Sequence, residues 1–502
     1  MPNIIPEIDD LIDAGKDLGM HVTRDDAVVY HKCLGKIFAA YELVDKFPDN
    51  IPEVHYPRNP GYAPKSSENY YNAWATKVHI NGAKQGSLFG KSLVLKDNIC
   101  LAGVPMMNGS SVYRGYVPEV DATVVKRVLD AGVKIIGKAH CESFCYSGGS
   151  HTNDTGHVKN PHKEQHSAGG SSSGCAVLVA IGEADLAIGC DQAGSIRIPA
   201  SFCGICGLKP TYGLVPYSGI SASEMTVDHV GPMTRNVANN ADLLEVLAGA
   251  DGLDPRQQGH ESDKYSEGLD RGVKGLKIGV LKEAFGLPNS EPEVDESVMN
   301  AAHVFTRLGA NVETVSIPIH RNSGAIRTPI AVEGGLQMML KGDGFGTNWK
   351  GLYVPSLIQA SKNWRYHADE LPDTLKYLML FGQYMMKKNG HKYYAKAQNL
   401  VRKMTEIYDK VLYKYDILIM PTLPITASPL PKSNSPKTEI IYRAHEMMAN
   451  TAAFTVTGHP AFSMPCGVKN DLPIGLMLVA KRFDEKTIYR AAYAYEQETN
   501  WL

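Results

Sequence analysis

Apolar residues recur at three- and four-residue spacing through the start of the chain. The segments 4–19 and 25–47, IIPEIDDLIDAGKDLG and DDAVVYHKCLGKIFAAYELVDKF, have the periodicity of amphipathic helices. Asp25 is the residue expected to cap the second run. Residues 48–66 are rich in proline, asparagine and serine, which is typical of a linker or crossing loop. We therefore predict an N-terminal helical extension over residues 1–70.

From about residue 75 the pattern changes to short apolar runs that alternate with helical patterns. SLVLK at 92–96 is a strand candidate, and DATVVKRVLDAGVKIIGK at 121–138 predicts a helix, a glycine stop and a short buried strand. The same rhythm recurs in three later segments, at 175–191, 275–317 and 415–424. Strands that alternate with amphipathic helices predict an α/β fold with helices on both faces of a sheet.

Residues 330–415 interrupt this alternation. They are rich in Met, Tyr and Lys and have a helical pattern. We predict that they form a helical cap or insertion beside the sheet.

Composition narrows the class of protein. The chain has 502 residues, 43% hydrophobic and 21% charged, with a formal net charge of −2, which is close to a globular average. The lack of a basic excess or a charge block argues against nucleic acid and membrane-surface partners. The most apolar glycine-flanked stretch, 175–190, carries Glu183 and Asp185 and is too broken to span a bilayer.

The cysteines and the N-terminus bear on the compartment. Nine cysteines are diluted over a long chain, and an odd number in apolar or glycine-rich runs favours reduced thiols. The first residues, MPNIIPEIDDLIDAG, are acidic and have no apolar centre, unlike a signal peptide. Both observations favour a cytoplasmic location.

The stretch GGSSSG at 169–174 allows two motif interpretations. Gly169 and Gly174 have the spacing of a phosphate-binding loop, but Cys175 occupies the place of the lysine that would reach the phosphates. The stretch also fits a nucleophile elbow centred on Ser172. An elbow needs a strand directly before it, and the preceding residues HKEQHSA are polar.

A zinc interpretation rests on H-x-E at 140–142 and on the C-x-x-C pair Cys203 and Cys206, which together imitate a deaminase signature. No proline directly precedes Cys203, so buried structural thiols are the simpler interpretation. Nothing around the pair resembles a thioredoxin-like redox unit. His162 and His166 lie in a polar, proline-containing loop. We predict neither a metal nor a cofactor.

Lys96 ends the apolar run SLVLK and alternates with Val94, which can place it on a core-facing side. Lysines are usually exposed, so the local pattern alone favours a surface lysine at a strand end. A serine hydroxyl, however, is a poor nucleophile without a group that takes its proton. The serines between 171 and 195 have no histidine in an obvious partner position, so their base must come from elsewhere.

Three stretches together resemble the amidase signature family: LKDN at 95–98, GGSSSG at 169–174 and DQAGSIRIPASFCGICGLKPTYGLVP at 191–216. The resemblance covers roughly residues 75–490, and it implies a domain with a central mixed, twisted β-sheet covered by helices on both faces. The runs GVPMMNGS, GLVPYSG and TVDHVGP are most similar to short-chain and aromatic amide hydrolases.

The resemblance implies a Ser–cis-Ser–Lys triad. The nucleophile would be Ser195, the bridging serine Ser171, after a cis peptide bond from Gly170, and the base Lys96. Burial would lower the pKa of such a lysine and leave a neutral amine able to accept a proton. Ser172 would either support the triad by hydrogen bonding or cap the following helix, and both roles stay open.

The stretch DQAG implies an oxyanion site. The backbone amides of Gln192, Ala193 and Gly194 would converge on the carbonyl oxygen of the substrate. Ala193 stands where the family commonly has glycine, and alanine tolerates fewer backbone conformations. Asp191 and Arg197 match an ion pair that would brace this loop.

The resemblance also implies an acyl pocket. Tyr146, Gly148 and Gly149, in FCYSGG, would border it, and Asn450 and Thr451 of a later helix would line it. A largely apolar pocket with a tyrosine wall would suit small aliphatic or aromatic acyl groups.

These features predict a serine amidohydrolase that cleaves small amides through an acyl-enzyme, with carbamate (urethane) and ester side activity. Its partner would be a small-molecule amide or carbamate, and the helical start would support a homodimer. The alternative is the A-type subunit of a glutamine-dependent tRNA amidotransferase, whose partner would carry the RNA. A catalytically inactive binding protein is disfavoured because all three triad positions are filled.

Overall fold

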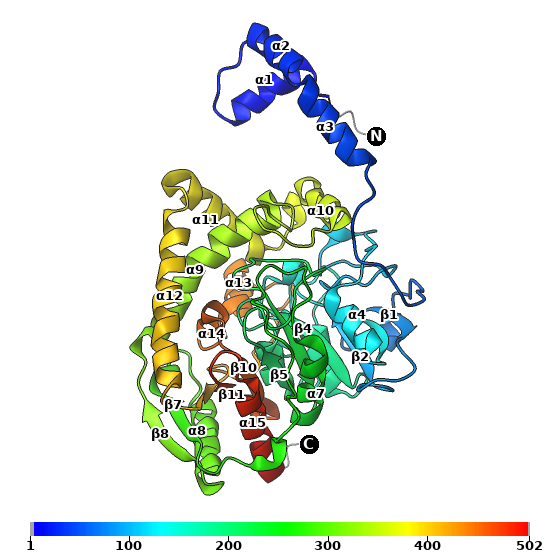
Figure 1. The fold of residues 1–502 in the computed structure, drawn as a ribbon. Coiled ribbons are helices and arrows are strands. Elements are labelled where there is room, and N and C mark those ends of the chain that lie inside the picture. The colour runs from blue at the N-terminus through cyan, green and yellow to red at the C-terminus, as the bar shows by residue number, and fades with distance from the viewer. Residues whose placement is uncertain (1–4, 500–502) are drawn as a thin grey trace. The chain divides into compact units, whose positions relative to one another are not determined.

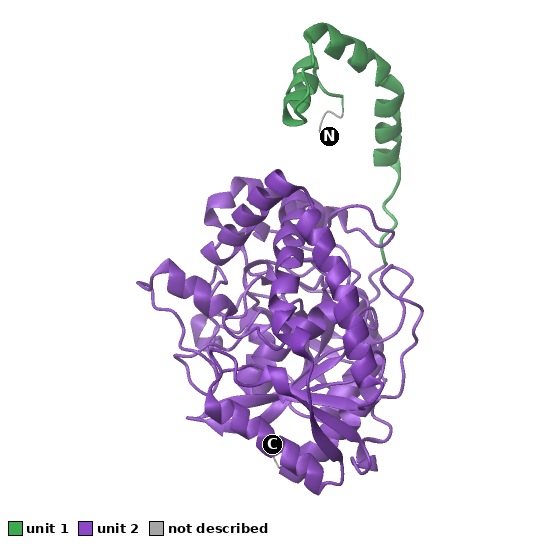
Figure 2. Cartoon of the chain, turned by 90° about the vertical axis from the view of Figure 1, so that its left-hand side faces the viewer, with its two compact units in different colours: residues 1–52 green, residues 53–502 purple. Residues whose placement is uncertain are grey.

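The computed structural model describes residues 5–499, and the chain divides into two compact units, residues 1–52 and 53–502 (Figure 2). The described part of the first unit consists of three helices, α1 (Ile8–Asp17), α2 (Arg24–Cys33) and α3 (Gly35–Lys46). The first four residues of the acidic N-terminal stretch lie outside the described residues. The division of the chain into residues 1–70 and 75–490 stays a prediction.

The start of α2 differs from the prediction. Thr23, and not Asp25, caps this helix, because the Thr23 hydroxyl accepts a hydrogen bond from the Asp26 amide at 3.1 Å. Asp25 lies within the first turn, where its charge complements the helix dipole. The predicted run 25–47 forms two helices, since regular helical structure is interrupted at Leu34.

The second unit is built on one mixed sheet. Within residues 5–499 it joins eleven strands in the order β1-β3-β2-β4-β6-β5-β10-β11-β9-β7-β8. The strands are β1 (Trp74–Asn81), β2 (Ser92–Lys96), β3 (Lys134–Ala139), β4 (Leu186–Asp191), β5 (Cys206–Lys209), β6 (His229–Thr234), β7 (Lys277–Leu281), β8 (Asn311–Val315), β9 (Ile417–Pro421), β10 (Ala461–Lys469) and β11 (Leu472–Val479). β2 is parallel to β3 and β4, whereas β4, β6, β5, β10, β11 and β9 pair antiparallel in succession.

Helices lie on both sides of this sheet (Figure 1). The helices of the second unit are α4 (Thr123–Asp130), α5 (Ser173–Ala180), α6 (Arg197–Cys203), α7 (Val237–Leu247), α8 (Pro292–Arg307), α9 (Ser323–Pro329), α10 (Pro355–Ser361), α11 (Asp373–Asn389), α12 (Lys392–Leu412), α13 (Lys437–His445), α14 (Ala452–Thr457) and α15 (Glu485–Thr499). Two π-helical segments, Ile330–Gly334 and Leu336–Lys341, follow α9. Residues 330–415 are therefore mainly helical.

Alternation along β9 explains why both faces are covered. Ile417 and Ile419 belong to the core that includes residues of α8 and α15. Leu418 and Met420 point the other way, into the core that includes residues of α12 and α14. A strand that buries both of its faces must be apolar throughout, and the fold class predicted from the sequence, α/β with helices on both faces, is confirmed.

The edge where β2 and β4 end positions the residues of interest. The two strands are parallel neighbours, so Lys96 and Asp191, their last residues, reach the same edge of the sheet. Lys96 has the same parity along β2 as Val94, which packs in the core formed with α5. α5 is apolar all round, and residues 173–179 are buried, as expected for a helix inside the core.

The apolar stretch 175–190 lies partly in α5 and partly in β4. Across residues 5–499, none of the helices combines the length and the apolar character needed to cross a bilayer.

Candidate active site

Lys96 is completely buried. Its Nζ donates to Ser171 Oγ at 2.7 Å and to the backbone carbonyl of Cys190 at 3.3 Å. The interpretation of Lys96 as a surface lysine is therefore wrong. Its position along β2 turns the side chain toward α5, and two oxygen atoms accept hydrogen bonds from its amine there.

The serines of the GGSSSG stretch lie directly against this amine. The Gly170–Ser171 peptide bond is cis. Ser172 Oγ donates to the Cys190 carbonyl at 3.2 Å and accepts from the Cys190 amide at 3.3 Å, so it fixes the end of β4. Ser172 makes no side-chain cap to α5, which leaves the hydrogen-bonding role and removes the capping role. No strand directly precedes Ser172, so the nucleophile elbow lacks its structural context.

Ser195 follows β4 in the loop that leads into α6. Its carbonyl accepts a hydrogen bond from the Ser172 amide at 3.2 Å, which brings it next to Ser171. The Ser195 side chain lines a cavity of about 290 Å³. The structure thus brings together Lys96, Ser171 and Ser195, three residues from separate segments.

An ion pair braces the loop. Arg197 Nε and Nη2 each donate to the Asp191 carboxylate at 3.0 Å, and both side chains are fully buried. Burial opposes the charge of Asp191, but Arg197 outweighs this effect and holds the pKa of that carboxyl well below its ordinary value. The Gly194 amide also donates to Asp191 at 2.7 Å. The carboxylate therefore fixes the backbone of the loop as well as the arginine.

The same contact changes the predicted set of oxyanion donors. The Gly194 amide is occupied by Asp191, whereas the amides of Gln192 and Ala193 have no acceptor within the described part of the chain. Gly194 has a φ of +137°, and a Cβ there would lie 2.6 Å from Thr451 Oγ1, so this position requires glycine. Ala193 has a negative φ, so an alanine fits.

The cavity beside Ser195 includes one predicted pocket residue. Tyr146 lines it, and its hydroxyl donates to the Ala331 carbonyl at 2.7 Å. Gly148 and Gly149 are absent from the lining among the described residues, because Gly148 packs against Met447, where a Cβ would lie 2.7 Å from the sulfur.

Asn450 and Thr451 lie behind the loop and not along the cavity formed by the described residues. Asn450 Nδ2 donates to the carbonyls of Pro421 at 2.9 Å and Ala284 at 3.1 Å, so Asn450 ties β9 to neighbouring segments. Thr451 Oγ1 donates to the Ala193 carbonyl. Thr451 therefore helps to hold residues 192–195, the loop predicted to form the oxyanion site and called the oxyanion loop below.

Three residues that line the cavity were not predicted from the sequence. Arg327 comes from α9, Tyr377 from α11 and His445 from α13. These helices are far apart in the sequence, and no local motif marks any of the three residues. Only the folded chain brings them to the cavity.

Comparison with known proteins agrees with this arrangement. A family model described as Amidase matches residues 42–489. The chain belongs to the amidase signature family. This relationship makes the chain an amidase-family hydrolase that acts on the C–N bonds of amides.

Two relatives and one solved structure illustrate the range of this amidase family. An enantioselective amidase from Rhodococcus rhodochrous is 44% identical over 438 residues, 86% of this chain and 84% of the relative. The A-type subunit of a glutamyl-tRNA(Gln) amidotransferase from Methanosarcina acetivorans is 37% identical over 431 residues, 85% of this chain and 88% of the relative. The crystal structure of the corresponding protein from Thermotoga maritima has a TM-score of 0.71 at 29% identity and covers 86% of this chain and 88% of its own.

The charge of Lys96 in this amidase depends on the cysteines around it. Burial is the largest influence and lowers the pKa of Lys96, but thiolates at Cys145, Cys190, Cys141 and Cys175 would together raise it above its ordinary value. The expectation that burial lowers the pKa of Lys96 and leaves a neutral amine was therefore wrong, because the neighbouring thiolates outweigh burial. Burial raises the pKa of Cys190 to about 12 and those of Cys141 and Cys175 further, so these three thiols stay neutral near pH 7.

Cys145 is the exception. Burial raises the pKa of its thiol, but a hydrogen bond from Cys141 and the charge of Lys96 outweigh burial and lower that pKa to about 7. The Cys145 sulfur also lies 3.3 Å from Asn108 Oδ1 and borders the cavity. Lys96 and Cys145 therefore favour each other's charged forms, and a charged Lys96 cannot accept a proton.

We expect Cys145→Ala to lower the pKa of Lys96, since it removes the one nearby group that becomes negative near pH 7. A base acts only above its own pKa, so the rising limb of kcat/KM against pH should move to lower pH, by roughly 1–3 units. A pH profile with a neutral amide measures this shift. Cys203→Ala is the matched control, because its thiol is also buried but bonds to the Ala168 carbonyl. An unmoved limb in Cys145→Ala would contradict the coupling.

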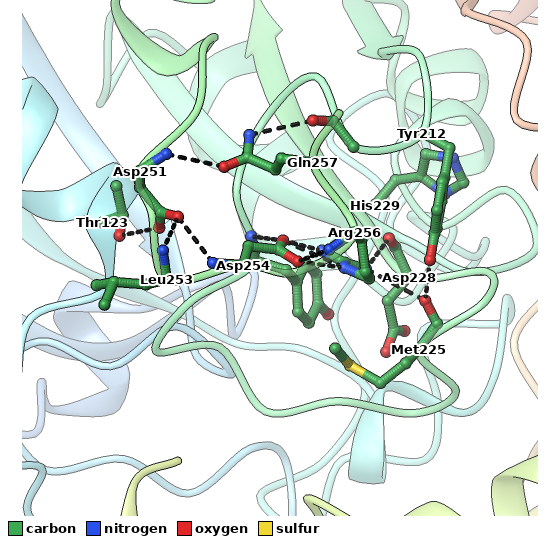
Figure 3. A network of polar contacts seen from close by, with 12 residues as sticks. Thr123, Tyr212, Met225, Asp228, His229, Asp251, Leu253, Asp254, Arg256 and Gln257 are labelled. Carbon is green, nitrogen blue, oxygen red and sulfur yellow. Dashed lines mark hydrogen bonds and ion pairs between the residues drawn. The ribbon is translucent and has the colours of Figure 1, made fainter. Parts of the chain in front are cut away.

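A buried polar network holds the side chain of Gln192. Gln192 Nε2 donates to Tyr217 Oη at 2.9 Å, and the Tyr217 amide donates to Asp254 at 2.8 Å. Asp254 pairs with Arg256 at 2.6 Å, and Arg256 reaches the Asp228 carbonyl at 2.8 Å (Figure 3). Through Gln192, these contacts connect the loop after β4 to the segment that holds Asp254 and Arg256.

The residues of the zinc interpretation make other contacts. His140 Nδ1 is hydrogen-bonded to Thr155 Oγ1 at 2.8 Å, and Cys203 Sγ to the Ala168 carbonyl at 3.3 Å. His162 Nε2 lies 2.9 Å from the Cys203 carbonyl. Over residues 5–499, no group of three or more His, Cys, Asp or Glu side chains is arranged to hold a metal ion.

Proposed function

We propose that this chain is a serine amidohydrolase of small aliphatic or aromatic amides, with Ser195 as nucleophile, Ser171 as bridging proton carrier and Lys96 as base. The observation that carries the proposal is the 2.7 Å hydrogen bond between Lys96 Nζ and Ser171 Oγ in a fully buried setting. Lysines are usually exposed, and burying an amine costs free energy. The burial of Lys96 beside Ser171 therefore supports a role for it in proton transfer.

The reaction follows from this geometry. Ser195 Oγ attacks the amide carbonyl carbon while its proton passes through Ser171 to Lys96. The amides of Gln192 and Ala193 donate to the oxygen that becomes negative, and one such donor contributes roughly 10²–10³ in rate. Lys96 returns the proton through Ser171 to the leaving nitrogen, the C–N bond breaks, and water hydrolyses the acyl-enzyme to the carboxylic acid.

Carbamates and esters fit the same steps. A carbamate has the same planar C(=O)–N group, so Ser195 would attack its carbonyl in the same way. An ester has an easier leaving group than an amide. We therefore propose urethane and ester hydrolysis as side activities.

A panel of amides, carbamates and esters tests the proposal, together with mass spectrometry of the enzyme quenched during turnover. We expect amide hydrolysis by the purified chain and an acyl adduct on Ser195. An adduct on another residue, or no turnover of any amide, would overturn the assignment.

The tRNA amidotransferase subunit is the second candidate, and its support is the 37% identical relative. Such a subunit must hold free glutamine, whose α-ammonium needs an acidic partner. No Asp or Glu lines the cavity among the described residues, which favours the hydrolase. Turnover of simple amides by the purified chain without a partner subunit would separate the two candidates.

We also propose a homodimer and a cytoplasmic location. Packing within the first unit leaves Ile37, Tyr41, Val44 and Phe47 exposed, and a second copy could cover these side chains. Light scattering of the full chain and of Val44→Asp tests the proposed dimer: we expect a dimer that the substitution weakens, and a monomeric wild type would refute it.

The proposed cytoplasmic location rests on the cysteines. Nine free cysteines, eight of them buried, support a reducing compartment.

A further inference from the structure

The cavity beside Ser195 is positively charged. Arg327 lines it, and no Asp or Glu does so in the described part of the chain. His445 lines it too, but burial, reinforced by the charge of Arg327, lowers the pKa of His445 to about 4 and leaves a neutral ring at pH 7. The thiol of Cys145 ionises near neutral pH, but its charge is matched by Lys96. The positive charge of Arg327 is therefore not balanced by an acidic side chain in the lining of the described cavity.

Arg327 lacks a counter-ion within the described part of the chain. Its Nε donates to the Gln192 carbonyl at 3.2 Å, and neither Nη has a hydrogen-bond partner among the described residues. The nearest acids are already engaged. Asp191 pairs with Arg197, and Glu224 accepts from Thr226 and Tyr394.

The neighbouring aromatic groups do not replace a counter-ion. The Tyr146 hydroxyl is committed to the Ala331 carbonyl, and burial raises its pKa, so Tyr146 stays neutral. Arg327 is partly buried, and its planar pair of Nη groups fits a carboxylate in two parallel hydrogen bonds. Arg327 therefore brings two unpaired Nη groups to the cavity that Ser195 also lines.

We propose that the acyl group of the substrate carries a second, free carboxylate, which pairs with Arg327 while the amide carbon faces Ser195. The substrate class is the monoamides of short dicarboxylic acids, hydrolysed to the dicarboxylate and ammonia or an amine. A cavity of about 290 Å³ has room for a compact acyl group of this kind. This inference rests on the proposed function, because it names the substrate of the same site.

The experiment compares glutaramate with pentanamide, a neutral amide of the same chain length. In the wild type we expect a higher kcat/KM for glutaramate, mainly through a lower KM. Arg327→Met should lower kcat/KM for glutaramate by roughly 100-fold more than it lowers kcat/KM for pentanamide, because only glutaramate loses a charge partner. Arg327→Lys should restore part of the difference, since the charge returns without the bidentate geometry. Glutarate should competitively inhibit the wild type but not Arg327→Met.

Arg321→Met is the matched control. Arg321 lies six residues earlier, its Nε also bonds a backbone carbonyl, that of Glu283 at 3.4 Å, and it does not line the cavity. We expect no change in the glutaramate preference.

Three results separate the possibilities. If Arg327→Met lowers kcat for both substrates equally, Arg327 only positions the oxyanion loop through Gln192, and the inference fails. If the wild type hydrolyses pentanamide but does not prefer glutaramate, the inference fails while the proposed function stands. If the wild type hydrolyses no amide, the proposed function itself fails.

Discussion

Ser195→Ala is expected to lower kcat for amide hydrolysis by about 10⁴–10⁶, the range seen when an enzyme loses its triad nucleophile. The Ser195 oxygen forms the bond to the acyl group, so its removal closes the acyl-enzyme route. The loop itself should persist, because Asp191 holds the Gly194 amide and the Arg197 side chain independently of residue 195. Initial rates with a neutral amide measure the loss, and intact-mass spectra should show no acyl adduct.

Ser172→Ala is the control for this experiment. Its hydroxyl bonds both backbone groups of Cys190 and none of the substrate-facing atoms, so we expect a partial loss, smaller than that of Ser195→Ala. The reverse order, with Ser172→Ala inactive and Ser195→Ala near full activity, would make Ser172 the nucleophile.

The fold was largely predictable because its elements are defined locally. The run SLVLK became β2 with the predicted bounds, and the segment 121–138 became a helix, a stop at Gly132 with φ of +86° and a strand. Strand parity also placed Lys96 on the face of Val94, although the residue type argued for exposure. The predicted cap at Asp25 was wrong because the chain offers two polar residues near the start of this helix. The hydroxyl of Thr23, two residues earlier, accepts from the Asp26 amide.

The site was predictable only as far as its motifs extend. Lys96, Ser171 and Ser195 lie in recognisable stretches, and the structure brings these stretches together. Two other properties belong to the folded chain alone. The carboxylate of Asp191 occupies the Gly194 amide, and Arg327 enters the cavity from a distant helix. No spacing in the sequence encodes either contact, because each depends on how non-adjacent elements pack.

The pKa of Lys96 illustrates the same limit. A sequence argument can predict that a lysine is buried, and burial lowers its pKa. It cannot predict that one of four neighbouring thiols, that of Cys145, has a pKa of about 7. The raised pKa of Lys96 depends on contacts that only the folded chain makes.

Arg197→Met is expected to lower the free energy of unfolding by about 3–5 kcal/mol, because it leaves the Asp191 carboxylate buried without its counter-charge. The carboxylate also holds the Gly194 amide, so its displacement or protonation should disorganise the oxyanion donors and reduce amide hydrolysis in parallel. The shift of the urea unfolding midpoint measures the stability change, and kcat measures the loss of alignment.

Two comparisons show whether the loss in the free energy of unfolding comes from the unpaired buried charge of Asp191 or from the loss of any arginine. Arg482→Met breaks an ion pair with Asp409 at 2.9 Å whose side chains are 45% and 41% exposed, and we expect about 0–1 kcal/mol. The double variant Asp191→Asn/Arg197→Met should be more stable than Arg197→Met alone, because it removes the unpaired charge. If the double variant were the less stable of the two, the cost would come from lost packing around Arg197 and not from the charge at Asp191.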